Sequence, residues 1–547
     1  EINHLHQQEG IAAVAQPWLP PLKERITLDE LDKVVPIEAW QKRTAPSVLI
    51  GVADIPQAQK QEAVAIDLSK DGNILLYGSP GTGKTTFLQT AAMDLARKQS
   101  PENLTMYLLD FGTNGLAPLT QLPHVADSLL LDQTEKIQKF IRIINRELDR
   151  RKKLLSEHGV GTIALYREVT GKQEPTMVIL MDSYESMKDE PYETDLFKLF
   201  MRISREGLSI GVHLIITASR QNNLRAQLYS NFKHQLTLPQ NDISEVRGIV
   251  GATPLASTME DIKGRALMKR DEVDVVQFAL PVVGDNDIQI INNLRDQVQS
   301  LKEMWTGRTP AGIPMVPDEL TEAAFYGRED VKESMENLEF PVGLDFEMLK
   351  TIKIPFDRLK NLVFMADSPE SLENQQKHLL NTALQFGSKL HIMLVDPLEE
   401  CVAYKDKVST YISSSQEISE IAKQLIYEVD RRLEKDLYSD WLIMMPTLKA
   451  IVDQGLTEKD LRYLFDHGPR VGMHFVIGSE YAYLGNNINE VPKYLKGNAQ
   501  WFMIGMRLMD QMFLDKPYNN REARLASDEI YLHDRKQAIK LKITKNG

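Results

Sequence analysis

From about residue 46 onward, short uninterrupted apolar runs alternate with stretches of helical periodicity. The clearest runs in the first half are ILLY (74–77), MYLLD (106–110), VILMD (178–182) and VHLIITAS (212–219). Runs of this length without polar alternation are typical of strands that are buried on both faces of a sheet. The spacing between them suits crossover helices, so the pattern predicts an α/β domain with a mainly parallel central sheet.

The segment that follows Thr134 carries the clearest helical pattern. Its apolar residues keep helical spacing as far as Leu155, and Gly159 supplies a stop signal. The charged run RELDRRKK (146–153) lies within this helix. Charge runs of this kind are more often solvated helix faces than binding patches, and we interpret this run as a solvated face.

The second half of the chain repeats the pattern of the first half in the same order. Five segments recur at offsets of 261 to 288 residues. The pairs are NILLY (73–77) with NLVFM (361–365), MYLLD (106–110) with IMLVD (392–396), ELDRR (147–151) with EVDRR (428–432), VILMD (178–182) with LIMMP (442–446), and GVHLIITAS (211–219) with GMHFVIGSE (472–480). Ordered self-similarity of this kind predicts two copies of one α/β domain.

Composition marks the borders of these copies. Prolines surround Trp18 near the start of the chain, and GRTPAGIPMVPDE (307–319) is rich in proline and glycine between the two halves. The sequence therefore predicts an irregular arm over residues 1–45, a first domain over 46–284, a linker over 285–319 and a second domain over 320–547.

Charge and cysteine content limit the classes of function. A formal net charge of −13 over 547 residues argues against a protein whose main task is to bind nucleic-acid phosphates. Cys401 is the only cysteine, which excludes an intrachain disulfide and a zinc site built on several thiolates. His213 and His474 lie inside apolar runs with no second histidine nearby, so we interpret them as core histidines.

The sequence shows no membrane-spanning run and no signal-peptide layout. No apolar stretch approaches the roughly 18 residues that a membrane-spanning helix needs. The chain begins with EINHLHQQEG rather than with Met. We therefore expect any membrane anchor to lie upstream of this chain.

A phosphate-binding loop is predicted directly after the run 74–77. GSPGTGKTT (78–86) satisfies the pattern G-x-x-x-x-G-K-[ST], with a predicted strand before it and a predicted helix after it. Its backbone N–H groups would point at phosphate oxygens, while Lys84 would reach the β- and γ-phosphates and Thr85 would join the shell of a Mg²⁺ ion. The predicted cofactors are ATP and Mg²⁺, bound by Gly78, Ser79, Pro80, Gly81, Thr82, Gly83, Lys84, Thr85 and Thr86.

A second acid is expected at the end of the VILMD run. Asp182 can hold Mg²⁺ through water there, so Thr85 and Asp182 are the predicted metal ligands. Hydrolysis also needs a residue that orients the attacking water, and the next position holds Ser183. Glu185 is the nearest carboxylate: it either takes this catalytic role, if the chain turns sharply, or is a surface residue.

Other candidates lie at strand ends and on the helix before the run 212–219. Thr217 and Ser219 either sense a γ-phosphate or satisfy turn backbone groups. Asp110 is either another site acid or a strand-end cap. Arg205 either serves a neighbouring subunit's site as an arginine finger, a role also open to Arg202, or is an exposed arginine.

The second copy lacks the residues of this chemistry. Aligning Ser79-Pro80 with Ser368-Pro369 places Glu373 at the position of Lys84, and Pro446 falls where Asp182 lies. A carboxylate in place of the ammonium group repels a triphosphate. We therefore expect no Mg-ATP binding in the second copy, and a role in recognition, regulation or assembly.

Together these residues resemble the FtsK/SpoIIIE group of RecA-like motor ATPases. The resemblance rests on the P-loop strand, on YLLDFG (107–112), on the strand that ends at Asp182 and on REGLSIGVHLIITASR (205–220). It implies two tandem RecA-like P-loop NTPase domains with mainly parallel central sheets. Within that group, the degenerate last copy and the PWLPP arm (17–21) make nearly the whole chain similar to the coupling ATPases of type VII secretion.

The resemblance also implies partners and a location. It implies a hexameric motor at the cytoplasmic face of the cell membrane, working with other membrane components of the secretion system. Its substrates would be small helical secreted proteins of the WXG100 type, recognised through a C-terminal signal that docks on an ATPase domain. The second copy is the candidate receptor for that signal.

Three positions depart from the family pattern. Ser183 replaces the usual catalytic glutamate, Ser219 stands where many members have glutamine, and Leu208 replaces a frequent arginine. We therefore expect weak or assembly-dependent hydrolysis in the first domain and an inactive second domain. Two alternatives stay open: a DNA translocase of the same group, although the acidic charge argues against DNA as a partner, and a non-hydrolysing scaffold that holds ATP as a structural ligand.

Overall fold

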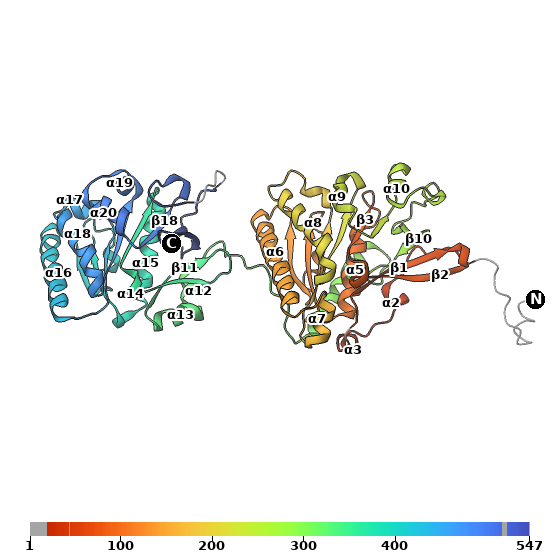
Figure 1. Ribbon diagram of the computed structural model, residues 1–547, viewed down its shortest axis with the longest axis horizontal. Helices are drawn as coiled ribbons and strands as arrows, with labels where there is room; N and C mark the ends of the chain where they lie inside the picture. Colours follow the sequence, from red (N-terminus) through yellow and green to blue (C-terminus); the bar gives the residue numbers. More distant parts are fainter. Residues whose placement is uncertain (1–18, 43, 517–521, 546–547) are drawn as a thin grey trace, which may run out of the picture. The chain divides into compact units, whose positions relative to one another are not determined.

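The computed structural model describes residues 19–42, 44–516 and 522–545. Two compact units divide the chain, Glu1–Ile313 and Pro314–Gly547 (Figure 1). The first part of the predicted arm, residues 1–18, lies outside the described residues.

The first unit is built on a ten-stranded mixed sheet within its described residues. The strand order is β2-β1-β10-β9-β8-β3-β7-β6-β4-β5, in which the six strands from β8 to β5 are parallel and the other four run antiparallel. The parallel strands β3, β4, β6 and β7 are the apolar runs of the sequence, and every residue in them is buried. The strands are β1 (Ser47–Ile55), β2 (Lys60–Asp67), β3 (Ile74–Tyr77), β4 (Leu104–Asp110), β5 (Val125–Leu130), β6 (Thr176–Asp182), β7 (Val212–Ala218), β8 (His234–Thr237), β9 (Arg265–Lys269) and β10 (Val273–Phe278).

Helices cover both faces of this sheet. The helices α6 and α8 pack together on one face, and α5 packs against β1 and β6 on the other (Figure 1). The helices are α2 (Leu28–Leu31), α3 (Pro36–Trp40), α4 (Leu68–Asp71), α5 (Lys84–Lys98), α6 (Thr134–Glu157), α7 (Ile163–Thr170), α8 (Glu193–Ile210), α9 (Ala226–Tyr229), α10 (Ile243–Val250) and α11 (Asp287–Met304).

The second unit repeats this topology strand for strand. Its sheet has the order β12-β11-β20-β19-β18-β13-β17-β16-β14-β15, which becomes the order of the first sheet when ten is subtracted from each number. Its strands are β11 (Glu339–Asp345), β12 (Thr351–Pro355), β13 (Asn361–Ala366), β14 (His391–Val395), β15 (Thr410–Ile412), β16 (Trp441–Met445), β17 (Met473–Glu480), β18 (Trp501–Gly505), β19 (Glu529–His533) and β20 (Ala538–Lys542). Its helices are α12 (Glu322–Tyr326), α13 (Glu329–Glu336), α14 (Phe356–Leu359), α15 (Pro369–Leu384), α16 (Ser415–Lys435), α17 (Leu448–Asp453), α18 (Glu458–His467), α19 (Tyr481–Asn486) and α20 (Glu490–Asn498). The predicted fold, two tandem α/β domains around mainly parallel central strands, is confirmed.

The borders of the units differ from the predicted ones. Helix α11 occupies the first part of the predicted linker 285–319 and buries one face, which includes Leu294 and Val298, in the core of the first unit. The helix contains many Asn, Gln and Asp residues and only a narrow apolar stripe, so the sequence pattern indicates a polar linker there. The arm also joins the first unit, because Leu280 donates a backbone hydrogen bond to Ile26 at 2.7 Å.

A matching contact shows that the repeat includes this arm. In the second unit Lys545 donates a backbone hydrogen bond to Leu320 at 3.0 Å, where the first unit has Leu280 and Ile26. In both units a threonine follows the accepting residue and caps a short helix, Thr27 for α2 and Thr321 for α12. Each unit therefore begins with a docked segment that pairs with the residues after its last strand.

The charged run on α6 is only partly a solvated face. Arg151 is 1% exposed and holds Glu147 of its own helix at 2.7 Å, while it donates to the backbone oxygens of Ile210 at 2.8 Å and Pro175 at 2.9 Å. The interpretation of residues 146–153 as solvated is therefore wrong at Arg151, whose side chain joins α6 to the segments before β6 and β7. Arg432 repeats these bonds in the second unit.

Candidate nucleotide site

The predicted phosphate-binding loop lies at the carboxyl ends of the parallel strands. It joins Tyr77 at the end of β3 to Lys84 at the start of α5. Gly81 and Gly83 adopt φ values of 82° and 116°, in the region that favours glycine. A Cβ at Gly78 would lie 2.7 Å from the Thr82 hydroxyl, which leaves no room for a side chain. The loop therefore has the tight curvature that an anion-binding loop needs.

The Lys84 ammonium group is folded into this loop. Its Nζ donates to the backbone oxygens of Gly78 at 2.6 Å and Ser79 at 3.1 Å. Burial lowers the pKa of Lys84, while Glu185 and Asp182 act in the opposite direction. The group thus lies inside the loop, within the field of two carboxylates, where a triphosphate would replace the backbone oxygens as its partner.

The two predicted metal ligands meet in the structure. Thr85 Oγ1 donates to Asp182 Oδ2 at 2.7 Å, and Thr217 Oγ1 donates to Asp182 Oδ1 at 2.6 Å. Asp182 is 2% exposed, so both hydroxyl contacts fix the orientation of a buried carboxylate. A hydroxyl and a carboxylate at the phosphate loop are the hard oxygen donors that Mg²⁺ prefers, and these residues fit such an ion.

Glu185 turns back toward the same site. Ser183 adopts the left-handed conformation with φ of 62°, and this sharp turn starts a short 3-10 helix over Tyr184–Met187. The Glu185 carboxylate accepts a hydrogen bond from the hydroxyl of Ser219 and another from the backbone N–H of Ser219 at 3.2 Å. The structure therefore brings together Glu185 and Ser219, two of the candidates from the ends of neighbouring strands.

Asp110 acts as a strand-end cap. Its Oδ2 accepts a hydrogen bond from the backbone N–H of Leu116 at 2.8 Å. Burial raises the pKa of this carboxyl and the nearby Asp182 adds to the increase, whereas the hydrogen bond from Leu116 lowers it. The loop held in this way passes close to Thr85, because a Cβ at Gly115 would lie 2.3 Å from Thr85 Cγ2. Gly115 is a site residue that the sequence did not reveal.

The arginine candidates do not reach the site of their own chain. Arg202 is engaged by Asp149 and Glu206 on the helical face of the first unit. Arg205 is exposed on the last turns of α8, which leads directly into β7. Because β7 begins just after α8 and ends beside the phosphate loop, Arg205 lies toward the amino ends of the parallel strands. The phosphate loop lies at their carboxyl ends.

A cavity of about 490 Å³ adjoins the loop and the start of α5. Gly83, Thr85 and Thr86 line it on the side of the phosphate loop, and Phe278 and Leu280 line it beside the last strand. The sequence did not predict it, since its walls come from distant segments.

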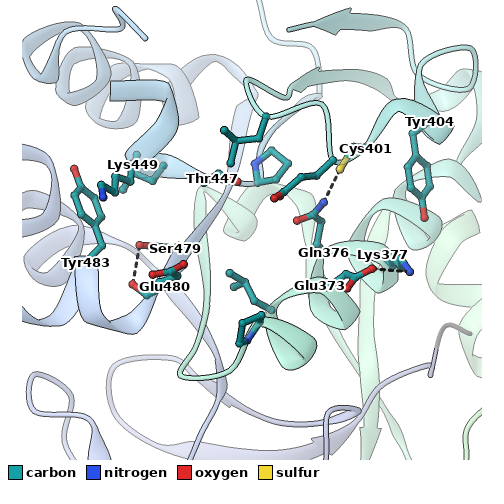
Figure 2. Close-up of a pocket in the computed structure, with 16 residues that line it drawn as sticks. Glu373, Gln376, Lys377, Cys401, Tyr404, Thr447, Lys449, Ser479, Glu480 and Tyr483 are labelled. Atoms are coloured by element: carbon teal, nitrogen blue, oxygen red, sulfur yellow. Dashed lines mark hydrogen bonds and ion pairs between the residues drawn. The ribbon is translucent and has the colours of Figure 1, made fainter. Parts of the chain in front are cut away.

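The second unit has a different structure at the equivalent place. Only Asp367 and Ser368 separate the end of β13 from the start of α15, where the first unit has the six residues from Gly78 to Gly83. Glu373 lies on α15 and forms an ion pair with Lys377 at 2.9 Å (Figure 2).

A cavity of about 450 Å³ remains there, and its charged lining residues are of both signs. Burial raises the pKa of Glu400, and Asp396 and Glu373 raise it further. The charged residues that line the cavity are Glu373, Glu400, Glu480, Lys377 and Lys449. A triphosphate would therefore find no phosphate loop there, and three carboxylates beside the two lysines.

Other predicted features also have a place in the structure. His213 is 1% exposed and His474 is completely buried, which makes both core residues. Across the described ranges, no group of three or more metal-ligating side chains comes together, and no helix is long and apolar enough to span a membrane.

Residues 37–258 match the model of the FtsK/SpoIIIE family. Among curated relatives, the type VII secretion system protein EssC of Staphylococcus aureus strain MSSA476 is 31% identical over 525 residues, which cover 95% of this chain and 35% of EssC. The ESX secretion system protein YukB of Bacillus subtilis strain 168 is 27% identical over 561 residues, which cover 99% of this chain and 36% of YukB. The chain thus spans about a third of the length of these relatives.

Solved structures share the tandem fold. EssC (ATPases 2 and 3) from Geobacillus thermodenitrificans superposes with a TM-score of 0.88 at 24% identity, covering 96% of this chain and 100% of that chain. Thermomonospora curvata EccC (ATPases 2 and 3), in complex with a signal sequence peptide, gives a TM-score of 0.64 at 20% identity, with 97% and 100% covered. At these identities the likeness establishes the fold.

Proposed function

The chain contains a domain of the FtsK/SpoIIIE family, and on that basis we propose that it is the ATP-binding coupling module of a type VII protein secretion system. The observation that carries the proposal is that Lys84 is folded into the loop 78–86 while Thr85, the next residue, donates a hydrogen bond to Asp182. The similarity to EssC and YukB, which extends over 95% and 99% of the chain, supplies the biological context.

The residues of the cleft have distinct roles in this proposal. Backbone N–H groups from Gly81 to Thr86 bind the phosphates, and the Lys84 ammonium group exchanges its backbone partners for β- and γ-phosphate oxygens. The Thr85 hydroxyl and the Asp182 carboxylate hold Mg²⁺, which neutralises phosphate charge when bound. ATP therefore binds in the first unit, and the second unit, which has no loop and a glutamate at the position of Lys84, binds none.

We propose that hydrolysis is weak or depends on assembly. Glu185 orients the attacking water, but in this structure Ser219 holds its carboxylate through two hydrogen bonds. Arg205 is exposed on α8, away from its own site, and in a hexameric ring it would serve as the arginine finger for the neighbouring chain. Turnover then requires both a released Glu185 and a correctly placed neighbour.

The second unit is proposed as the receptor for substrates. The complex of Thermomonospora curvata EccC with a signal sequence peptide shows that a protein of this tandem fold binds such a peptide. The substrates of this chain would be small helical WXG100-type proteins with a C-terminal signal. The module would work at the cytoplasmic face of the membrane with other components of the secretion system.

Two binding measurements test this function. A fluorescent C-terminal peptide from a WXG100-type protein should bind the full chain and should lose binding when residues 314–547 are deleted, while ATP binding persists. Equal peptide binding by both forms would refute the receptor role. Salt-dependent binding of double-stranded DNA in place of peptide binding would favour the translocase, and ATP binding without turnover in an assembled hexamer would favour the scaffold.

A further inference from the structure

The cavity beside the phosphate loop is lined by the segment that leads into the first unit and by the helix that leads out of it. Glu24 and Arg25 of the incoming arm line it, together with Asp287, Ile290 and Ile291 of the outgoing helix α11. All five residues lie outside the segment that matches the FtsK/SpoIIIE model, which covers residues 37–258. The segment that matches the family model therefore does not include these walls.

The arm is seated against the floor of this cavity. Leu28 donates a backbone hydrogen bond to Leu280 at 3.1 Å, and Leu280 donates one to Ile26 at 2.7 Å. The side chains of Leu22, Ile26 and Leu28 are buried. Leu280 also lines the cavity, so the residue that pairs with the arm is part of the cavity wall.

The mouth of the cavity is bridged by charged groups. Lys263 Nζ lies 3.1 Å from Asp287 at the start of α11, and Arg25 donates to the backbone oxygen of Gly284, just before that helix. The loop that carries Lys263 is tied to the phosphate loop, because Gly264 donates to the Thr82 backbone oxygen at 2.9 Å. The arm, α11 and the phosphate loop are thus linked to one another by hydrogen bonds and an ion pair around the mouth of the cavity.

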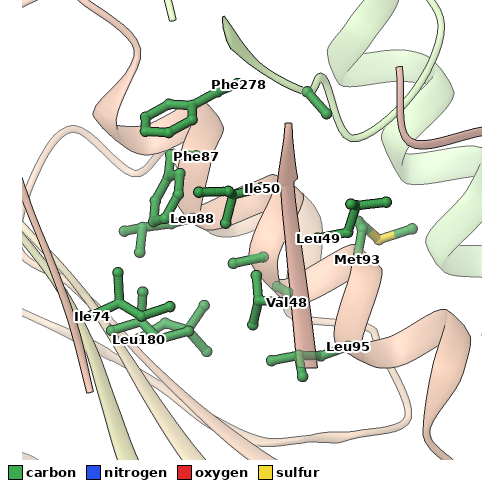
Figure 3. Packing of buried hydrophobic residues seen from close by; sticks show 14 of the residues in the cluster. Val48, Leu49, Ile50, Ile74, Phe87, Leu88, Met93, Leu95, Leu180 and Phe278 are labelled. Atoms are coloured by element: carbon green, nitrogen blue, oxygen red, sulfur yellow. The ribbon is translucent and has the colours of Figure 1, made fainter. Parts of the chain in front are cut away.

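The interior suits the base and ribose of a nucleotide. Phe278 packs against Phe87 of α5 with ring centroids 4.7 Å apart (Figure 3). Both side chains also line the cavity. Leu280 and Ile290 add apolar surface, while Arg25 and Lys263 supply donors at the mouth. The other lining residues are largely polar or charged and include Glu24, Gln277 and Asp287, so the cavity offers both apolar surface and hydrogen-bonding groups to a small molecule.

We propose that the arm is a nucleotide-responsive element of the first unit, with Arg25 as a binding residue for the base and ribose end of the nucleotide. Nucleotide in the phosphate loop extends into the cavity and contacts Arg25, which stabilises the docked arm. By reciprocity, the docked arm raises nucleotide affinity by the same factor. Whatever precedes the arm in a longer chain can thus communicate with the site, and this inference rests on the nucleotide binding proposed above.

Calorimetric titration of ATP into the full chain tests the contact. Arg25→Ala should bind ATP about three- to tenfold more weakly than the unaltered chain, the loss expected for one ordinary hydrogen bond made by an exposed side chain. Lys23→Ala is the matched control, because Lys23 lies on the same arm but pairs with Glu30 outside the cavity. Unchanged ATP affinity in Arg25→Ala would overturn the inference, whereas no ATP binding by the unaltered chain would overturn the proposed function instead.

Inorganic tripolyphosphate separates the two ends of the nucleotide. It fills the phosphate loop but has no base or ribose, so it should bind the unaltered chain and Arg25→Ala equally. An equal loss of affinity for ATP and for tripolyphosphate would overturn the inference, because Arg25 would then act on the phosphates and not through the cavity.

Hydrogen exchange of the unaltered chain provides a second test that needs no variant. At ATP about ten times its Kd, the amide of Leu280 that bonds to Ile26 should exchange about two- to sixfold more slowly, because opening the arm would lower the affinity for ATP by the same three- to tenfold. The equivalent amide of Lys545, which bonds to Leu320 in the second unit, should not change. Equal exchange at Leu280 with and without ATP would contradict the linkage.

Discussion

Thr85 Oγ1 donates a hydrogen bond of 2.7 Å to Asp182 Oδ2, which joins the first turn of α5 to the end of β6 across 97 residues of sequence. Thr217 holds the other oxygen of the same carboxylate at 2.6 Å, so the acid is fixed before any ion arrives. A carboxylate whose orientation is already fixed can bind a metal ion without a further loss of side-chain conformational freedom. The geometry makes Asp182 the residue on which the magnesium dependence of ATP binding should rest.

We expect Asp182→Asn to remove most of that dependence. The amide keeps the shape of the side chain but loses the charge, so the gain in ATP affinity on adding Mg²⁺ should fall by about 10- to 100-fold. Titrations of ATP with and without Mg²⁺ measure this gain. Asp110→Asn is the control, since Asp110 caps a neighbouring strand, and an equal effect there would contradict the assignment of Asp182.

Lys84→Ala should abolish the nucleotide site of the chain. Removal of a charged partner from a desolvated contact weakens binding by about 100-fold or more. Because the second unit has two residues where the first has its loop, equilibrium binding should give one Mg-ATP per unaltered chain and none per Lys84→Ala chain at the same concentration. A stoichiometry of two, or residual tight binding in the variant, would place a nucleotide in the second unit.

Glu185→Gln separates binding from turnover. If Glu185 orients the attacking water, the variant should hydrolyse ATP about 100-fold more slowly in the assembled state, with an unchanged Kd for ATP. Single-turnover hydrolysis and equilibrium binding on the same preparation measure the two quantities. A normal rate would leave the carboxylate only its structural contact with Ser219.

The sequence predicted the parts of the site that are local. Glycine spacing specifies the loop from Gly78 to Gly83, and uninterrupted apolar runs specify the strands that end at Tyr77 and Asp182. The order of five repeated segments predicted the second unit, since each segment is a buried strand or helix whose pattern survives loss of the chemistry.

What the sequence did not reveal depends on contacts between distant segments. The docked arm pairs with Leu280, more than 250 residues away, and a single backbone pairing leaves no periodic signal. Gly115 is constrained by the methyl group of Thr85, which only the folded loop brings near. Arg151 lies among exposed charges in the sequence, and only the carbonyl oxygens that surround it distinguish it from Arg150.

Buried histidines should make the first unit sensitive to mild acid. Burial lowers the pKa of His124 and of His213 to about 4. The unfolded chain takes up protons at these residues below about pH 6.5, whereas the folded chain stays neutral there, so each histidine removes up to about 1.4 kcal/mol of stability per pH unit as the pH falls from 6.5 to 4. Urea unfolding of residues 1–313 at several pH values measures this slope, and His213→Leu should reduce it; an unchanged slope would show that His213 does not contribute.

The buried arginine of the α6 helix offers the sharpest test of stability, because its neighbour in the sequence is a matched control. Arg151→Met leaves the oxygens of Ile210 and Pro175 without their donor and leaves Glu147 without its buried partner, so the first unit should lose about 3 kcal/mol of unfolding free energy. Arg150 also pairs with Glu147, but its side chain is 48% exposed, and Arg150→Met should lose less than about 1 kcal/mol. Urea unfolding of residues 1–313 compares the two variants. Equal losses of unfolding free energy in the two variants would mean that water satisfies the carbonyl oxygens around Arg151 when the guanidinium group is removed. The hydrogen bonds from Arg151 to the segments before β6 and β7 would then contribute little to stability.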